Sequence, residues 1–187
     1  MCGIAGIFHA ETPKPVDPMR VERMCDALAH RGPDGAGVWT DQGVGLGHRR
    51  LSIIDVAGSP QPMHSADNRA VIVFNGEIYN FRELRRELEQ SGFTFRTSGD
   101  TEVILAAWQR WGPDCLKRFD GMFAFALFDR DKRQLLLARD RFGVKPLFHA
   151  ALSDGSIAFA SELKGLLAHP LLRRRVNPQA IEAYMTW

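Results

Sequence analysis

Short apolar runs, separated by stretches rich in glycine and proline, recur along the whole chain. The compact run Val71–Phe74 combines β-branched and aromatic residues, which predicts a buried strand. The pair Asn75-Gly76 follows it, and this dipeptide is typical of a tight turn that ends a strand. Similar runs predict further strands over residues 4–8, 37–39, 45–54, 121–128, 135–138, 146–150 and 157–160.

Other segments have apolar residues at roughly helical spacing. Pro18 opens a predicted helix in which Met24 and Leu28 face the same side. Asp100 is a suitable N-cap for a helix that reaches Trp111. Further helices are predicted over residues 81–90, 162–168 and 178–184, and loops over HRGPDGAG and residues 58–68.

The predicted strands come in consecutive groups that helices separate. This order favours an α+β fold in which two antiparallel sheets pack on each other with helices outside, over a doubly wound parallel sheet. The chain has 187 residues, of which 45% are hydrophobic and 25% charged, as in one ordinary globular domain.

Charge and cysteine content exclude several classes of function. The net charge is only +2, and the one basic cluster, Arg173–Arg175, has no aromatic residue interleaved with it, so no nucleic-acid partner is expected. No apolar stretch is long enough to span a membrane, and the first residues lack the basic region of an export signal. Cys2, Cys25 and Cys115 form no CxxC pair, which argues against a disulfide framework or a structural metal site. We therefore expect a cytoplasmic protein without a metal or a membrane partner.

Cys2 stands directly behind the initiator methionine. Removal of Met1 would give Cys2 a free α-amine, and α-amines have a pKa of about 7.7–8.0, which suits general-base catalysis. Nucleophile and base would then share one residue. Taken alone, a small hydrophobic residue that begins a strand is the simpler interpretation of Cys2.

Other polar residues acquire a chemical interpretation beside Cys2. Asn75 and Gly76 offer an amide side chain and an N–H that suit a developing oxyanion, although an ordinary hairpin turn also explains them. Arg50, inside an otherwise apolar strand, could pair with a carboxylate through two hydrogen bonds or face water at a sheet edge. The plainer role of Asp100 is that of a helix cap.

Several motifs occur in one order over nearly the whole chain: MCGIAGIF, HRGPDG, GHRRLSIID, FNGEIYN, SGDTEVI, GMFAFALFD and ARDRFGVKPLF. Together they resemble the glutaminase domain of class II glutamine amidotransferases, a branch of the N-terminal nucleophile hydrolases. The closest likeness is to the asparagine synthetase (glutamine-hydrolysing) family, and bacterial relatives linked to exopolysaccharide or exosortase loci share the same motifs. The resemblance covers about residues 2–168 and implies a four-layer αββα sandwich of two antiparallel sheets with outer helices.

The resemblance implies catalytic roles for matching residues. Cys2 would be the nucleophile that attacks glutamine and forms a thioester. Asn75 and Gly76 would form the oxyanion hole. The segment at residues 30–34 resembles a flexible loop near the pocket, whose glycines would allow a lid to close.

The resemblance also implies a set of substrate contacts. Arg50 would hold the α-carboxylate of glutamine, and Glu77 and Asp100 would bind its α-amine. One cation and two anions suit a zwitterionic amino acid. The implied binding residues are Arg50, Ile53, Asn75, Gly76, Glu77 and Asp100.

Members of this family carry a second domain, which binds ATP through an SGGxDS-like loop and consumes the ammonia; this motif does not occur in the sequence here. The resemblance therefore implies a single glutaminase domain over residues 1–187, expected to be the N-terminal part of a longer synthetase. This domain would need no cofactor, since ATP and Mg belong to the synthetase domain. Expected partners are L-glutamine, that C-terminal domain and, for assembly, a second copy in a homodimer. Two alternatives stay open: an N-terminal nucleophile amidase that acts on another amide, and a non-catalytic regulatory domain.

Overall fold

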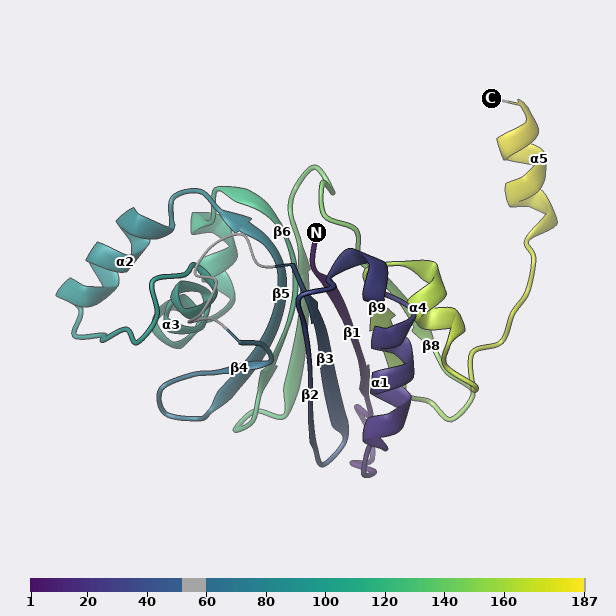
Figure 1. Cartoon of the computed structure of the whole chain (residues 1–187), viewed down its shortest axis with the longest axis horizontal. Coiled ribbons are helices and arrows are strands. Elements are labelled where there is room, and N and C mark those ends of the chain that lie inside the picture. Colours follow the sequence, from purple (N-terminus) through teal and green to yellow (C-terminus); the bar gives the residue numbers. More distant parts are fainter. Residues whose placement is uncertain (52–59, 187) are drawn as a thin grey trace.

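Two antiparallel sheets pack face to face, and helices cover the outer face of each, so the chain has four layers (Figure 1). The structure is a computed structural model that describes residues 1–51 and 60–186. The predicted α+β sandwich with outer helices is confirmed.

The first sheet has five strands, and its central strand β1 carries the N-terminus into the molecule. The pairing of β1 with β3 places Gly3 opposite Arg49 and Phe8 opposite Val44. The strands in spatial order are β2 (Gly35–Asp41), β3 (Val44–Arg50), β1 (Gly3–Phe8), β9 (Ile157–Ala160) and β8 (Phe148–Ala151).

Helices α1 (Pro18–Asp26) and α4 (Leu163–Leu167) cover the outer face of this sheet. Pro18 begins α1 as predicted. The helix lies close to the sheet because β3 carries glycine beneath it: a Cβ on Gly47 would lie 2.4 Å from the sulfur of Cys25. Any larger residue at this position would push α1 outward.

The second sheet has four strands and is covered by α2 (Phe81–Gln90) and α3 (Thr101–Trp111). Short 3₁₀ turns, η1 (Ala29–Arg31) and η2 (Gly112–Arg118), follow α1 and α3 along the chain. The strands in spatial order are β4 (Met63–His64), β5 (Ala70–Ile78), β6 (Gly121–Asp129) and β7 (Gln134–Arg139).

Strand β5 belongs to two hydrophobic cores at once. Val71 and Val73 pack between the two sheets, whereas Ile72 and Phe74 pack against the helices. Successive side chains of a strand point to opposite faces, so a continuous apolar run is required here. By the same alternation Asn75 lies on the face between the sheets.

The structure corrects the predicted turn at Asn75-Gly76. Strand β5 continues to Ile78, and Gly76 is paired with Phe123 of β6. A Cβ on Gly76 would lie 2.3 Å from the carbonyl oxygen of Met122. Glycine is required here because strands β5 and β6 lie too close together for a side chain, and not because the chain turns.

Two other predictions need adjustment. Strand β3 ends at Arg50, and residues 52–54 of the predicted strand over 45–54 lie outside the described residues. The predicted loop at residues 58–68 contains the short strand β4, which pairs with β5.

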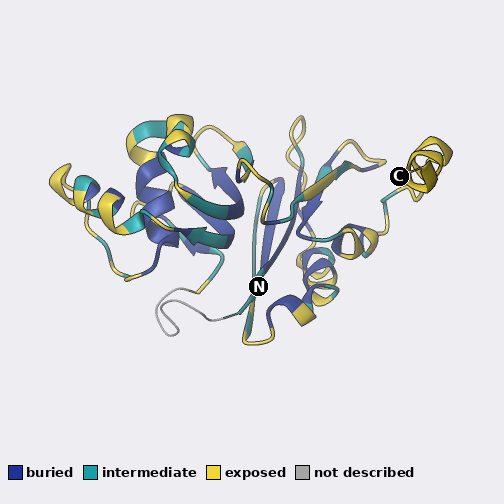
Figure 2. Cartoon of the chain, turned by 90° about the horizontal axis from the view of Figure 1, so that it is seen from above, coloured by how far each residue is buried: buried dark blue, intermediate teal, exposed yellow. Residues whose placement is uncertain are grey.

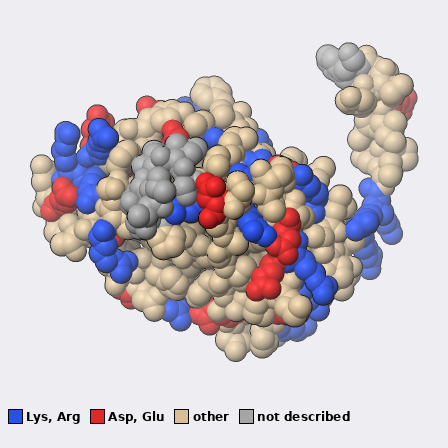
Figure 3. All heavy atoms as spheres, in the orientation of Figure 1, with Lys and Arg blue, Asp and Glu red and all other residues tan. Residues whose placement is uncertain are grey.

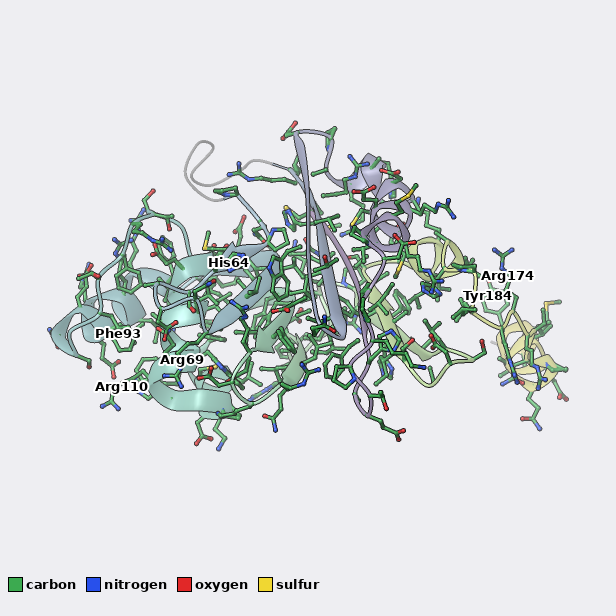
Figure 4. The ribbon with its side chains drawn as sticks, turned by 90° about the horizontal axis from the view of Figure 1, so that it is seen from below. His64, Arg69, Phe93, Arg110, Arg174 and Tyr184 are labelled. Carbon is green, nitrogen blue, oxygen red and sulfur yellow. The ribbon has the colours of Figure 1, made fainter. Side chains whose placement is uncertain are left out.

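Helix α5 (Pro178–Thr186) forms where a helix was predicted and lies apart from the four layers (Figures 1 and 2). None of its described residues is buried, and Figure 4 shows Tyr184 of this helix, and Arg174 before it, away from both sheets. Arg173–Arg175 are exposed before the helix, where Figure 3 shows basic side chains gathered. No helix within residues 1–51 and 60–186 is both long and apolar enough to cross a membrane.

Candidate active site

One pocket collects the predicted site residues from both sheets. Its lining comes from the start of β1 and the end of β3 in the first sheet, from β5 in the second, and from the N-terminus of α3. Ile53, also predicted to line the pocket, lies outside the described residues. The predicted residues that line the pocket are Cys2, Arg50, Asn75, Gly76, Glu77 and Asp100.

Cys2 is half-buried at the entrance to β1. The N–H of Leu51 donates to its sulfur at 3.4 Å, and the thiol lies 3.5 Å from the carbonyl oxygen of Leu51. The carbonyl of Cys2 accepts a hydrogen bond of 2.8 Å from Nε of Arg31. Cys2 is therefore held from two sides: its sulfur contacts Leu51, directly after β3, and its carbonyl binds Arg31 of η1.

Sequence reasoning assigned no separate role to Arg31, which is only 8% exposed. Its Nη1 donates to Glu162 at 2.8 Å. Burial opposes ionisation of Glu162, but hydrogen bonds from Arg31, His30 and Lys164 outweigh it and lower the pKa of this carboxyl to about 2. The ion pair of Arg31 and Glu162 thus supports the strand that carries Cys2. Its signal in the sequence was the HRGPDG motif.

The glycine of the HRGPDG motif has a packing role. A Cβ on Gly32 would lie 2.4 Å from the backbone carbonyl of Arg49, so the loop passes directly over β3. Gly35 already belongs to β2. Closure of this loop as a lid stays a prediction.

Asn75 is 1% exposed, and its side-chain nitrogen has no hydrogen-bond partner among the residues that the structure describes. An unpaired buried N–H group is costly, so such a donor marks a site where an acceptor is expected. The neighbouring carbonyl of Phe74 lies 3.1 Å from Nε2 of His48 on β3, which ties the two sheets together beside the pocket.

Asp100 is 6% exposed, and its Oδ2 accepts a hydrogen bond of 2.9 Å from the N–H of Ile78. Burial, with a smaller contribution from the Glu77 carboxylate, raises the pKa of Asp100 to about 6, although the hydrogen bond from the Ile78 N–H opposes the rise. Asp100 does occupy the position before α3, but its side chain makes no capping hydrogen bond. The predicted N-cap position is confirmed, but the carboxylate is held by β5 instead of capping the helix.

Lys145 also lines the pocket, although the sequence analysis gave it no role. It is 7% exposed, and its Nζ lies 3.3 Å from the sulfur of Met1. The motif ARDRFGVKPLF contains it and was the signal in the sequence. Within residues 1–51 and 60–186 no group of three or more His, Cys, Asp or Glu side chains is placed to hold a metal.

The fold is a two-sheet sandwich in which a cysteine stands directly before the central strand β1. The model of the family described as "Glutamine amidotransferase domain" matches residues 1–187. The chain belongs to this family.

Relatives and one solved structure make the family more specific. Asparagine synthetase [glutamine-hydrolyzing] 3 of Bacillus subtilis (strain 168) is 40% identical over 95% of this chain and 29% of the relative. A putative asparagine synthetase [glutamine-hydrolyzing] of Mycobacterium bovis is 47% identical over 89% of this chain and 28% of the relative. The chain thus spans less than a third of the length of these relatives. The structure of glutamine phosphoribosylpyrophosphate amidotransferase from B. subtilis matches with a TM-score of 0.74 and 23% identity over 93% of this chain and 45% of that chain, which confirms the fold.

Proposed function

We propose that this chain hydrolyses L-glutamine to L-glutamate and ammonia, with Cys2 as the nucleophile once Met1 has been removed. The observation that carries the proposal is the meeting, in one pocket, of the Cys2 thiol with the Asn75 amide donor, which has no partner among the described residues. A thiol beside a buried N–H donor suits attack on an amide carbonyl, because the donor can bind the oxyanion that forms.

The charges in the pocket support an amino acid as the substrate. Arg50 offers a guanidinium that can bind a carboxylate through two hydrogen bonds. Glu77 and Asp100 lie on the same pocket and can bind an ammonium group. A free α-amino acid carries both groups, whereas a simple amide carries neither.

The proposed chemistry has two halves. The Cys2 thiolate attacks the side-chain carbonyl carbon of glutamine, and the oxyanion is bound by the Asn75 amide and the Gly76 N–H. The α-amine of Cys2, which has taken the thiol proton, passes a proton to the departing nitrogen. The C–N bond then breaks, ammonia is released, and the glutamyl group stays bound to Cys2 as a thioester. The same amine then takes a proton from water, which attacks the thioester, and the C–S bond breaks to release glutamate.

An assay of the processed chain tests the proposal. Release of ammonia and glutamate from L-glutamine, with little hydrolysis of a simple amide such as butyramide, is the expected result. Equal hydrolysis of both substrates would favour an N-terminal nucleophile amidase of another specificity. No hydrolysis of either, by protein whose first residue is Cys2 by mass spectrometry, would favour a non-catalytic domain.

Asn75→Ala is expected to lower kcat by about a hundredfold to a thousandfold, which is the usual cost of losing one oxyanion donor. The KM for glutamine should change little, because the charge that Asn75 meets exists only after attack. Steady-state kinetics measures both constants. Asn177→Ala, which removes an exposed asparagine before α5, is the control and should leave kcat unchanged. A sharp rise in KM with kcat unchanged would make Asn75 a binding residue instead.

Glutamine binding is expected to weaken in acid because Asp100 loses its charge. Its pKa is raised to about 6, so the carboxylate is ionised above that pH and protonated below it. Calorimetry with the Cys2→Ala variant isolates binding from catalysis; the Kd should rise about tenfold per pH unit below pH 6. Asp100→Asn should bind weakly at every pH. A Kd that stays constant between pH 5 and 7 would exclude Asp100 from amine binding.

The ammonia acceptor is also part of the proposal. We propose that residues 1–187 are the glutaminase part of a longer chain that delivers ammonia to an ATP-dependent, asparagine synthetase-like amidation. The names and greater length of the relatives support this proposal. ATP and Mg would be required only by that second part. A homodimer stays a prediction, and a cytoplasmic setting fits the three free thiols.

A further inference from the structure

The ammonium group of Lys145 lies beside the chain terminus. Lys145 is buried, and its Nζ contacts the sulfur of Met1, which is a weak acceptor. Within the described residues no carboxylate is recorded in an ion pair with it. A buried charge of this kind is costly, which makes its position worth explaining.

The loop between β7 and β8 is built to hold Lys145 in place. The carboxylate of Asp140 accepts hydrogen bonds from the N–H groups of Phe123 at 3.2 Å, Val144 at 2.8 Å and Lys145 at 2.9 Å. Nε of Arg139 donates to the carbonyl of Lys145 at 2.7 Å. Lys145 is therefore anchored to β6 and β7 on both sides of its peptide unit.

Several charged groups act on the terminus together with Lys145. From β3, β5 and the N-terminus of α3, the pocket receives Arg50, Glu77 and Asp100. Arg31 reaches the carbonyl of Cys2 from η1, but Glu162 pairs with it. Lys145 thus adds a cation on the side of the pocket that Met1 occupies.

We propose that Lys145 is a positioning residue whose ammonium keeps the processed terminus reactive, by favouring the neutral amine and the thiolate of Cys2. The proposal rests on the proposed function. A nearby cation disfavours a second positive charge on the amine and stabilises the negative charge of the thiolate. Both effects act in the direction that catalysis by Cys2 needs.

The pH dependence of thiol alkylation tests the proposal without glutamine. Processed protein is treated with iodoacetamide across a pH series, and mass spectrometry follows the Cys2 peptide. Burial raises the pKa of both Cys25 and Cys115 to about 12, so these thiols stay silent near neutral pH. In Lys145→Met, half-maximal alkylation of Cys2 should move up by about one pH unit, because the thiolate loses a cation that lines the same pocket.

Matched variants separate charge from structure. Lys145→Arg keeps the charge and should keep the parent profile. Lys132→Met removes a lysine that pairs with Asp129 at the far end of β6, and it should also keep the parent profile. Thermal unfolding checks each protein, and Lys145→Gln replaces Lys145→Met if the latter does not fold.

The second measurement is the pH dependence of kcat/KM for glutamine. In Lys145→Met the acid limb of this profile should shift together with the alkylation profile. An unchanged alkylation profile in Lys145→Met overturns the proposal. A higher KM without any shift also overturns it, because Lys145 would then bind substrate. If the alkylation profile shifts but the parent does not hydrolyse glutamine, the proposed function fails while the role of Lys145 stands.

Discussion

Replacing Cys2 by alanine is expected to abolish glutamine hydrolysis. The thiol is the nucleophile in the proposed mechanism, and loss of a nucleophile in a comparable hydrolase costs about a millionfold in kcat. Ammonia release by the variant should therefore fall to the background of the assay. The fold should persist, because Cys2 is half-buried and, among the residues that the structure describes, its sulfur makes two weak contacts, both with Leu51.

Cys25 and Cys115 are the matched controls for this prediction. Both are buried free thiols with a pKa raised to about 12 by burial, so neither supplies a thiolate near neutral pH. Cys25→Ala and Cys115→Ala should retain most of the activity. An electrophilic glutamine analogue should label Cys2 alone. A label on Cys25 or Cys115, or activity in Cys2→Ala, would contradict the assignment.

The layered fold could be predicted because local patterns and packing agree. The run Val71–Phe74 is apolar on both faces, and the structure buries one face between the sheets and the other under helices. Pro18 fixed the start of α1 through its own geometry. In such segments the local preference and the global fold require the same residues.

The sequence misled where a residue serves a distant partner. Asn75-Gly76 has the composition of a turn, but the glycine is required by the backbone of β6, more than 40 residues further along the chain. Asp100 precedes a helix, yet its carboxylate binds the N–H of Ile78 on β5. Rules based on neighbouring residues in the sequence cannot predict such long-range contacts.

The residues of the candidate site were predicted from the family resemblance, but the residues that hold Cys2 in place were not. Cys2, Arg50 and Asp100 come together in one pocket. Arg31 and Lys145 were missed as individual residues, because Arg31 contacts Cys2 and Lys145 contacts Met1, and both partners are distant in sequence. Only the motifs that contain them pointed to these segments.

A preparation that retains Met1 is expected to fold normally and to be nearly inactive. With Met1 in place the nitrogen of Cys2 is an amide, which cannot accept the thiol proton, and general-base catalysis contributes about a hundredfold to ten-thousandfold. The structure adds a second effect, because Met1 itself lines the pocket and its sulfur contacts Lys145. We therefore expect kcat to fall and the KM for glutamine to rise.

One protein, measured before and after cleavage, tests this prediction most directly. The chain is made behind a removable leader whose protease leaves Cys2 as the first residue, so that both forms share the same fold and purification. The uncleaved form should unfold at nearly the same temperature as the cleaved form, since β1 and its pairing with β3 begin only at Gly3. Activity should appear in step with the mass of the cleaved N-terminal peptide. Full activity in chains that mass spectrometry finds to carry Met1 quantitatively would refute the α-amine as the base, because no free amine would then exist on the nucleophile.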